Sequence, residues 1–93
     1  MNKDKLNKAR KKIDYIDNNI LKLIKERTKI VKYMLTLKKY KSQIVDHKRI
    51  NVILKSIKVK SIRLGIDPKI TLKIWKSMIW SYVHFQKRNF KKK

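Results

Sequence analysis

The sequence predicts an all-α protein built from three helices, one long and two shorter. Apolar residues recur at three- and four-residue spacings along most of the 93 residues, which is the periodicity of amphipathic helices. One glycine and one proline leave little material for tight turns or hairpins. No alternating strand pattern, internal repeat or glycine-rich phosphate loop is visible. We therefore expect a single helical domain over residues 1–93.

The first helix is predicted over about residues 4–39. Its apolar positions are 13, 16, 20, 23, 24, 30, 31, 34 and 37. A helix of this length is roughly 50 Å long, whereas a compact domain of this size is about 26 Å across. Because one short chain cannot cover such a rod, we expect a partner chain to cover it.

The second helix is predicted over about residues 46–64, after the short connection KYKSQIV (39–45). Asp46 is a good N-cap for this helix, because its side chain can accept a hydrogen bond from a free backbone N–H of the first turn.

The third helix is predicted over about residues 68–88, and it runs into a basic tail at 87–93. Gly65 suits the C-terminal cap of the second helix. Asp67 suits the N-cap of the third helix, and Pro68 suits its first position.

The net charge is strongly positive, with 28 Lys plus Arg against 6 Asp plus Glu, a formal +22. This balance suits nucleic acid, an anionic membrane or a small acidic substrate. Codon drift in an AT-rich genome explains it as well, because Ile and Asn are abundant together with Lys. Trp75, Trp80 and Tyr40 could stack on bases, but most aromatic residues lie on the apolar face of the third helix. Nucleic acid is therefore the less favoured partner.

Several classes of protein are disfavoured by what the sequence lacks. It has no cysteine, and His47 and His84 are too few and too isolated to suggest a metal site. The first residues are charged and lack the apolar core of a signal peptide, and no apolar run has the length of a membrane span. We expect a cytoplasmic protein with no metal and no membrane partner.

Four polar residues fall in phase with the apolar stripes. Arg10, Arg27 and Lys38 lie on or beside the stripe of the first helix, and Gln86 lies on that of the third. An unpaired buried cation is costly, and the chain has only six acidic residues. Each long side chain could instead reach solvent at the edge of the core. Four such residues in phase favour a bound anion.

Spacing sharpens this interpretation. Arg27 and Lys38 are eleven residues apart, so they lie on one face of a helix about 16 Å apart. They could hold opposite ends of one small dicarboxylate. Arg10 is about 25 Å from Arg27 along the same helix, so it could join them only from an antiparallel copy. This predicts a homodimer with two equivalent sites between its subunits.

The segments ARKKIDYID (9–17), KERTKIVKYMLTLK (25–38), VDHKR (45–49) and LGIDP (64–68), with the stretch from Tyr82 to Gln86, carry a resemblance. Together they resemble the all-helical class of chorismate mutase over roughly residues 6–90. The resemblance implies three helices per chain in an intertwined homodimer. It also implies conversion of the dicarboxylate chorismate to prephenate in aromatic amino acid biosynthesis, without a cofactor.

The resemblance also implies roles for the polar residues. Arg10 would reach across from the partner chain, and Arg27 would clamp a substrate carboxylate. Lys38 would contact the ether oxygen and a carboxylate, and Gln86 would donate a hydrogen bond to the same ether oxygen. The reaction is a pericyclic Claisen rearrangement, which needs a compact substrate conformer and donors aimed at the oxygen that gains charge.

The wall of the site departs from the mutase pattern at two positions. Asp46 and Arg49 would shape the wall at the start of the second helix, but Ile50 replaces a Glu and Tyr82 replaces a Ser. These residues are similar to those of isochorismate pyruvate lyases, which share the fold and form salicylate and pyruvate. Ile50 could also be ordinary core in a mutase. We lead with the mutase because aromatic amino acid synthesis is widespread, and keep the lyase as the alternative, ahead of a non-catalytic helical protein.

Overall fold

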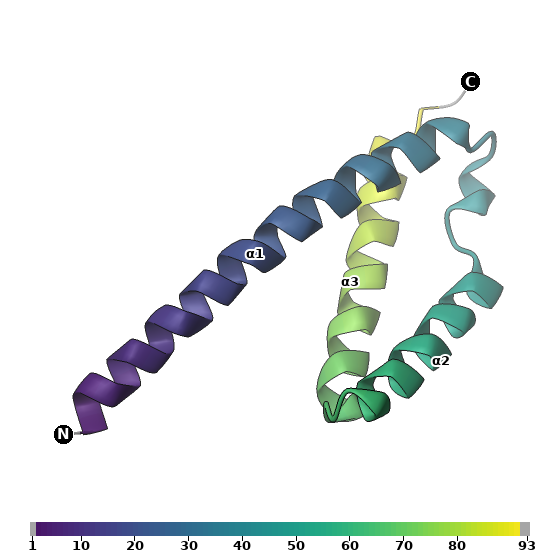
Figure 1. Cartoon of the computed structure of the whole chain (residues 1–93). Coiled ribbons are helices and arrows are strands. Elements are labelled where there is room, and N and C mark those ends of the chain that lie inside the picture. Colours follow the sequence, from purple (N-terminus) through teal and green to yellow (C-terminus); the bar gives the residue numbers. More distant parts are fainter. Residues whose placement is uncertain (1, 92–93) are drawn as a thin grey trace. The chain divides into compact units, whose positions relative to one another are not determined.

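The structure is a computed structural model that describes residues 2–91. Helix α1 spans Asn2–Leu37, the short 3₁₀ helix η1 spans Lys41–Gln43, α2 spans His47–Arg63 and α3 spans Pro68–Asn89 (Figure 1). No strand occurs within the described range. The predicted all-α class with one long and two shorter helices is confirmed.

The end of α1 comes two residues earlier than the sequence predicts. The backbone N–H of Lys38 donates to the carbonyl of Leu35 at 3.2 Å, a tightened bond to the third residue back. The next two N–H groups, of Lys39 and Tyr40, both donate to Oε1 of Gln43 at 2.8 Å. The Gln43 side chain thus replaces the carbonyls of the helix, and α1 ends at Leu37.

The start of α2 and the start of α3 are capped as the sequence predicts. Asp46 Oδ1 accepts from the Arg49 N–H at 3.0 Å, and Asp67 Oδ1 accepts from the Lys69 N–H at 2.9 Å. Pro68 occupies the first turn of α3, where its missing N–H leaves no hydrogen bond unmade. At its other end, α3 continues to Asn89 and includes the start of the predicted basic tail.

Gly65 ends α2 in the left-handed conformation, with φ of 73°. Its N–H donates to the Ile62 carbonyl at 3.1 Å, and the Ile66 N–H donates to the Ser61 carbonyl at 2.8 Å. This pair of bonds is the Schellman motif, which favours glycine because a side chain is strained at positive φ. The motif turns the chain back so that α3 can pack against α2.

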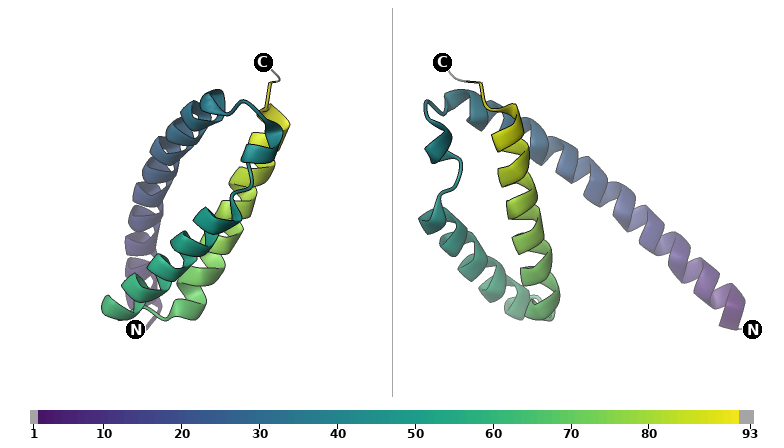
Figure 2. Two further views of the ribbon diagram at one scale, coloured as in Figure 1. Left: turned by 90° about the vertical axis from the view of Figure 1, so that its right-hand side faces the viewer. Right: turned by 180° about the vertical axis from the view of Figure 1, so that it is seen from behind.

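The chain divides into two compact units, residues up to Tyr33 and residues from Met34 onward. The first unit consists of most of α1. In the second unit, α2 and α3 form a hairpin in which the two helices contact each other (Figure 2). The core of the second unit contains Leu35, Ile44 and Val83, with Val45 and Phe90 packed against them.

Two hydroxyl groups connect the helices of the hairpin. Ser61 on α2 is only 3% exposed, and its Oγ lies 2.6 Å from Oγ1 of Thr71 on α3. The same Oγ donates to the Ile57 carbonyl at 2.6 Å. A buried hydroxyl without a partner is costly, so this pairing favours one register of α2 on α3.

Large apolar side chains of the first unit remain exposed in the single chain. Those on the predicted stripe of α1 are Ile13, Ile16, Ile20, Leu23, Ile24 and Ile30. The helical periodicity of the third helix predicts that Ile70, Ile74, Ile79 and Val83 face inward. Ile79 and Val83 are buried, but Ile70 and Ile74 are more than half exposed in the single chain. The prediction is wrong for these two residues, because the core cluster contacts α3 further along, at Val83.

No helix in the described part of the chain combines the length and the hydropathy that a membrane crossing needs.

Candidate active site

Lys38 and Gln86 are 48 residues apart in sequence and meet in the structure. The Lys38 Nζ donates to Gln86 Oε1 at 2.6 Å. Gln86 is only 7% exposed, and Lys38 is half-buried. Core packing explains this contact. Leu35, one turn before Lys38, packs in the same cluster as Val83, which lies one turn before Gln86.

The ammonium group of Lys38 is subject to two opposing influences. Burial lowers the pKa of Lys38, because removal from water disfavours the charged form. The negative charge of Asp46 acts in the opposite direction and is the smaller influence. A partly desolvated ammonium binds an anion more strongly than one in bulk water.

The residues that the resemblance assigns to the wall of the site, Asp46, Arg49 and Ile50, lie at the start of α2. Asp46 is held by its own capping bond to Arg49 N–H, and its charge acts on Lys38. The Arg49 side chain is exposed, and Ile50 is half-buried in the first turn of α2. The cap therefore fixes the carboxylate that acts on Lys38.

Tyr82 lies on α3 one turn before Gln86, so the two residues are about 6 Å apart along the helix axis. The Tyr82 side chain is half-buried. Six of the eight predicted site residues thus belong to the second unit. Within it, Lys38 contacts Gln86 and is influenced by the charge of Asp46, and Tyr82 lies one turn before Gln86 on α3.

Arg10 and Arg27 belong to the first unit. Arg10 is exposed on α1, and Arg27 is half-buried on the same helix. Their participation in a site with Lys38 and Gln86 stays a prediction.

The Lys38–Gln86 pair is suited to binding an electronegative oxygen. Gln86 uses its carbonyl oxygen to accept from Lys38, so its NH₂ group remains as a donor. Lys38 has two further N–H bonds after the one it gives to Gln86. The pair therefore offers donors of both kinds, charged and neutral. Among the described residues, no group of His, Cys, Asp and Glu is arranged to hold a metal ion.

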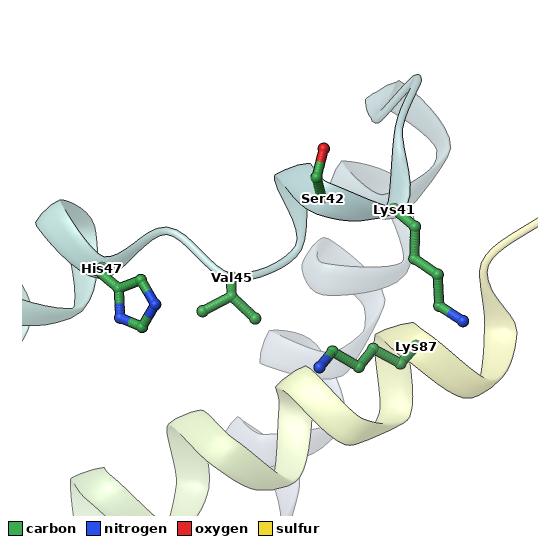
Figure 3. Close-up of a pocket in the computed structure, with 5 residues that line it drawn as sticks. All are labelled: Lys41, Ser42, Val45, His47 and Lys87. Atoms are coloured by element: carbon green, nitrogen blue, oxygen red, sulfur yellow. The ribbon is translucent and has the colours of Figure 1, made fainter.

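Sequence reasoning missed a shallow hollow beside the connection between α1 and α2. Its volume is about 580 Å³, and it is lined by Lys41, Ser42, Val45, His47 and Lys87 (Figure 3). The lining residues come from η1, the connection, α2 and α3, and no stripe or motif in the sequence unites them. Only the packing of the second unit brings them together.

Comparison with known proteins identifies the family. A family model described as chorismate mutase type II matches residues 9–87, which is most of the chain. The protein belongs to the chorismate mutase type II family. This membership confirms the resemblance noted in the sequence and supports a chorismate mutase-type function. Searches of curated proteins and of solved structures gave no match.

Proposed function

We propose that the protein is a chorismate mutase, which rearranges chorismate to prephenate. The observation that carries this proposal is the 2.6 Å contact between Lys38 Nζ and Gln86 Oε1. It places a cation and an amide donor together at positions that the family resemblance assigns to the ether oxygen of the substrate. The family match over residues 9–87 supports the same reaction class.

The proposed chemistry needs no covalent help from the protein. In the rearrangement, the ether C–O bond breaks while a C–C bond forms, and no proton is transferred. Negative charge builds on the ether oxygen as its bond lengthens. Lys38 and the Gln86 NH₂ group stabilise that charge by hydrogen bonds that strengthen in the transition state. Arg27 holds a carboxylate and keeps the substrate in its compact conformer.

We propose further that the active molecule is a homodimer in which Arg10 enters the site from the partner chain. The exposed stripe of α1 supports this proposal: Ile13 is 56% exposed, Leu23 is 64% exposed and Leu37 is 63% exposed. A second α1 in antiparallel orientation would cover these side chains, and the burial of such apolar area drives association. The same orientation would carry Arg10 towards Arg27 and Lys38.

A second candidate function is isochorismate pyruvate lyase, which forms salicylate and pyruvate on the same fold. Two observations favour it. Ile50 is half-buried at a wall position where the mutase pattern has Glu, and Tyr82 is half-buried where that pattern has Ser. An apolar residue cannot accept a hydrogen bond from a substrate hydroxyl, so Ile50 weakens the case for chorismate.

Parallel assays of the purified protein with chorismate and with isochorismate decide between the two reactions. Prephenate as the faster product supports the mutase, and salicylate as the faster product supports the lyase. The Ile50→Glu variant should raise kcat/KM for chorismate relative to isochorismate if this position sets the preference. An unchanged ratio would assign Ile50 to packing alone.

The role of Lys38 is tested with a neighbouring lysine as the control. Lys38→Gln should lower kcat about 100-fold or more, because one donor to the developing charge is lost. Lys39→Gln removes the same charge from an exposed side chain that lies over the Tyr40 ring, and it should leave kcat close to that of the wild type. Equal losses in both variants would show that general surface charge, and not the Lys38–Gln86 pair, matters.

A further inference from the structure

The hollow beside the connection between α1 and α2 has the size of a ligand site. Its volume of about 580 Å³ lies within the range of sites for small molecules. Lys41 and Ser42 come from η1, His47 begins α2, and Lys87 lies near the end of α3. In Figure 3 the Lys41 side chain extends towards α3, and the Lys87 side chain extends along α3 in the direction of Val45.

The lining is cationic and contains no carboxylate. Lys41 and Lys87 contribute two ammonium groups, and His47 adds an imidazole. Within residues 2–91, no hydrogen bond or ion pair engages the side chains of these three residues. The nearest acidic residue in sequence, Asp46, uses Oδ1 to cap α2. Like charges gathered from separate elements repel one another, and a bound anion relieves that repulsion.

The hollow is separate from the Lys38–Gln86 pair. Lys87 follows Gln86 directly, but successive residues of an α-helix project about 100° apart. For this reason Gln86 is buried, whereas Lys87 is exposed. Lys41 lies beyond the end of α1, in η1. An anion in the hollow would therefore contact the outer side of the connection and not the buried amide of Gln86.

We propose that this hollow binds a small multivalent oxyanion that carries phosphate or carboxylate groups. Lys41 and Lys87 each donate charge-assisted hydrogen bonds to its oxygens, and the His47 imidazole provides a further polar contact. Val45 and the methylene stems of the two lysines contact its carbon skeleton where it has one. A bound oxyanion ties residues 41–47 to the end of α3 and so rigidifies the segment that follows Lys38.

The test is an NMR titration of the full-length protein with pyrophosphate and, separately, with citrate, at constant ionic strength set with sodium chloride. We expect saturable shifts of backbone amides concentrated in residues 41–47 and 84–90, with a Kd below about 1 mM for at least one anion. A response to pyrophosphate alone assigns phosphate ligands, and a response to citrate alone assigns carboxylates. Shifts that fail to saturate, or that spread along α1, would overturn the proposal.

Variants separate the hollow from general surface charge. The double variant Lys41→Gln/Lys87→Gln should weaken binding at least about tenfold, because two charge-assisted contacts are lost. Its matched control is Lys58→Gln/Lys73→Gln, which changes two exposed lysines outside the hollow. Lys58 lies about 16 Å beyond His47 along α2, and Lys73 lies about 21 Å before Lys87 along α3. The control should bind like the wild type, and an equal loss in both would contradict the proposal.

One more variant keeps this proposal independent of the proposed function. Lys38→Gln should bind pyrophosphate or citrate as tightly as the wild type, because Lys38 does not line the hollow. Loss of binding in this variant would mean that the anion occupies the reaction site, and the hollow would be rejected. Because the readout is binding and not turnover, failure of the enzyme assays leaves this result interpretable.

Discussion

Lys38 illustrates at the scale of a single residue how a charge is kept in a partly buried position. Its environment lowers the pKa of its ammonium group through burial, with partial opposition from the Asp46 charge. A neutral or apolar residue would avoid this desolvation. The retention of a cation there, in contact with the buried Gln86 amide, fits a role in binding an anionic or electron-rich ligand.

The lowered pKa of Lys38 predicts opposite effects of alkaline pH on activity and on stability. At pH values between the pKa of Lys38 in the folded protein and its higher pKa in the unfolded chain, the unfolded state binds more protons than the folded state. The contribution of Lys38 to the free energy of unfolding therefore rises with pH across that window. Activity should fall across the same window, because the ammonium group loses its proton.

Two measurements check this prediction. The first is the pH profile of kcat/KM, which should decline on the alkaline side below the ordinary titration range of lysine. The second is urea unfolding of the wild type and of Lys38→Gln across the same pH range. As the pH rises, the free energy of unfolding of the wild type should increase relative to that of Lys38→Gln. A constant difference together with a flat activity profile would contradict the argument.

Asp46 offers a separate prediction because its two roles can be divided. Asp46→Asn keeps a good N-cap but removes the charge that raises the pKa of Lys38. The alkaline decline of kcat/KM should therefore begin at a lower pH, while helix content stays unchanged by circular dichroism. Asp67→Asn makes the same exchange at the N-cap of α3 and should leave the profile in place. A shift in both variants would assign the effect to net charge.

At the scale of the elements, the α2–α3 hairpin depends on local signals and on one buried polar contact. Asp46, Gly65, Asp67 and Pro68 set the ends of the helices through interactions within a few residues. The sequence could predict all four, since caps depend on neighbouring backbone groups. The contact between Ser61 and Thr71 joins residues of different helices, so no local sequence pattern predicts it.

This contact predicts a specific loss of stability. Ser61→Ala should lower the free energy of unfolding by about 1 kcal/mol or more, because Thr71 loses its partner in a part-buried site. The control is Ser81→Ala, since the Ser81 Oγ also donates to the carbonyl four residues back, at 2.8 Å from Ser77, but is exposed. Urea denaturation measures both variants.

A double-mutant cycle completes the test. Ser61→Ala combined with Thr71→Val should be less destabilising than the sum of the single changes, because each single change leaves a hydroxyl without its partner. Additive effects would show that the two hydroxyls do not interact.

At the scale of the whole molecule, the exposed stripe of α1 is the main feature that one chain does not explain. Exposed apolar side chains along a helix of 36 residues are typical of a surface that another chain covers. The proposed homodimer gives this surface an occupant and places Arg10 of one chain in the site of the other. Both expectations are tested by exchange of subunits.

Subunit exchange predicts recovery of activity from two inactive variants. Arg10→Ala and Lys38→Gln should each lose most activity as homodimers. In a mixed dimer, the site that uses the intact Arg10 of one chain and the intact Lys38 of the other is complete. After unfolding and joint refolding at equal amounts, activity should recover to about a quarter of the wild-type value, since half of the dimers are mixed and each has one complete site.

Two outcomes would contradict the shared site. If sedimentation equilibrium shows that the wild type is a monomer at assay concentration, the proposed dimer is rejected. The second outcome is that activity does not recover although native mass spectrometry detects mixed dimers. Arg10 and Lys38 would then act in a site of the same chain, or Arg10 would not belong to the site.

The sequence by itself determined the helices, the caps between α1 and α3 at Asp46, Gly65 and Asp67, and the polar positions in phase with the apolar stripes, because these depend on periodicity and on neighbours within a few residues. Lys38 and Gln86 were identifiable for that reason, as cation and amide placed where apolar residues were expected. Only the tertiary structure decided that Lys38 donates to Gln86, that Ser61 pairs with Thr71 and that Lys41, His47 and Lys87 share one hollow. These contacts join residues from different elements, and their geometry follows from how the core around Leu35, Ile44 and Val83 packs.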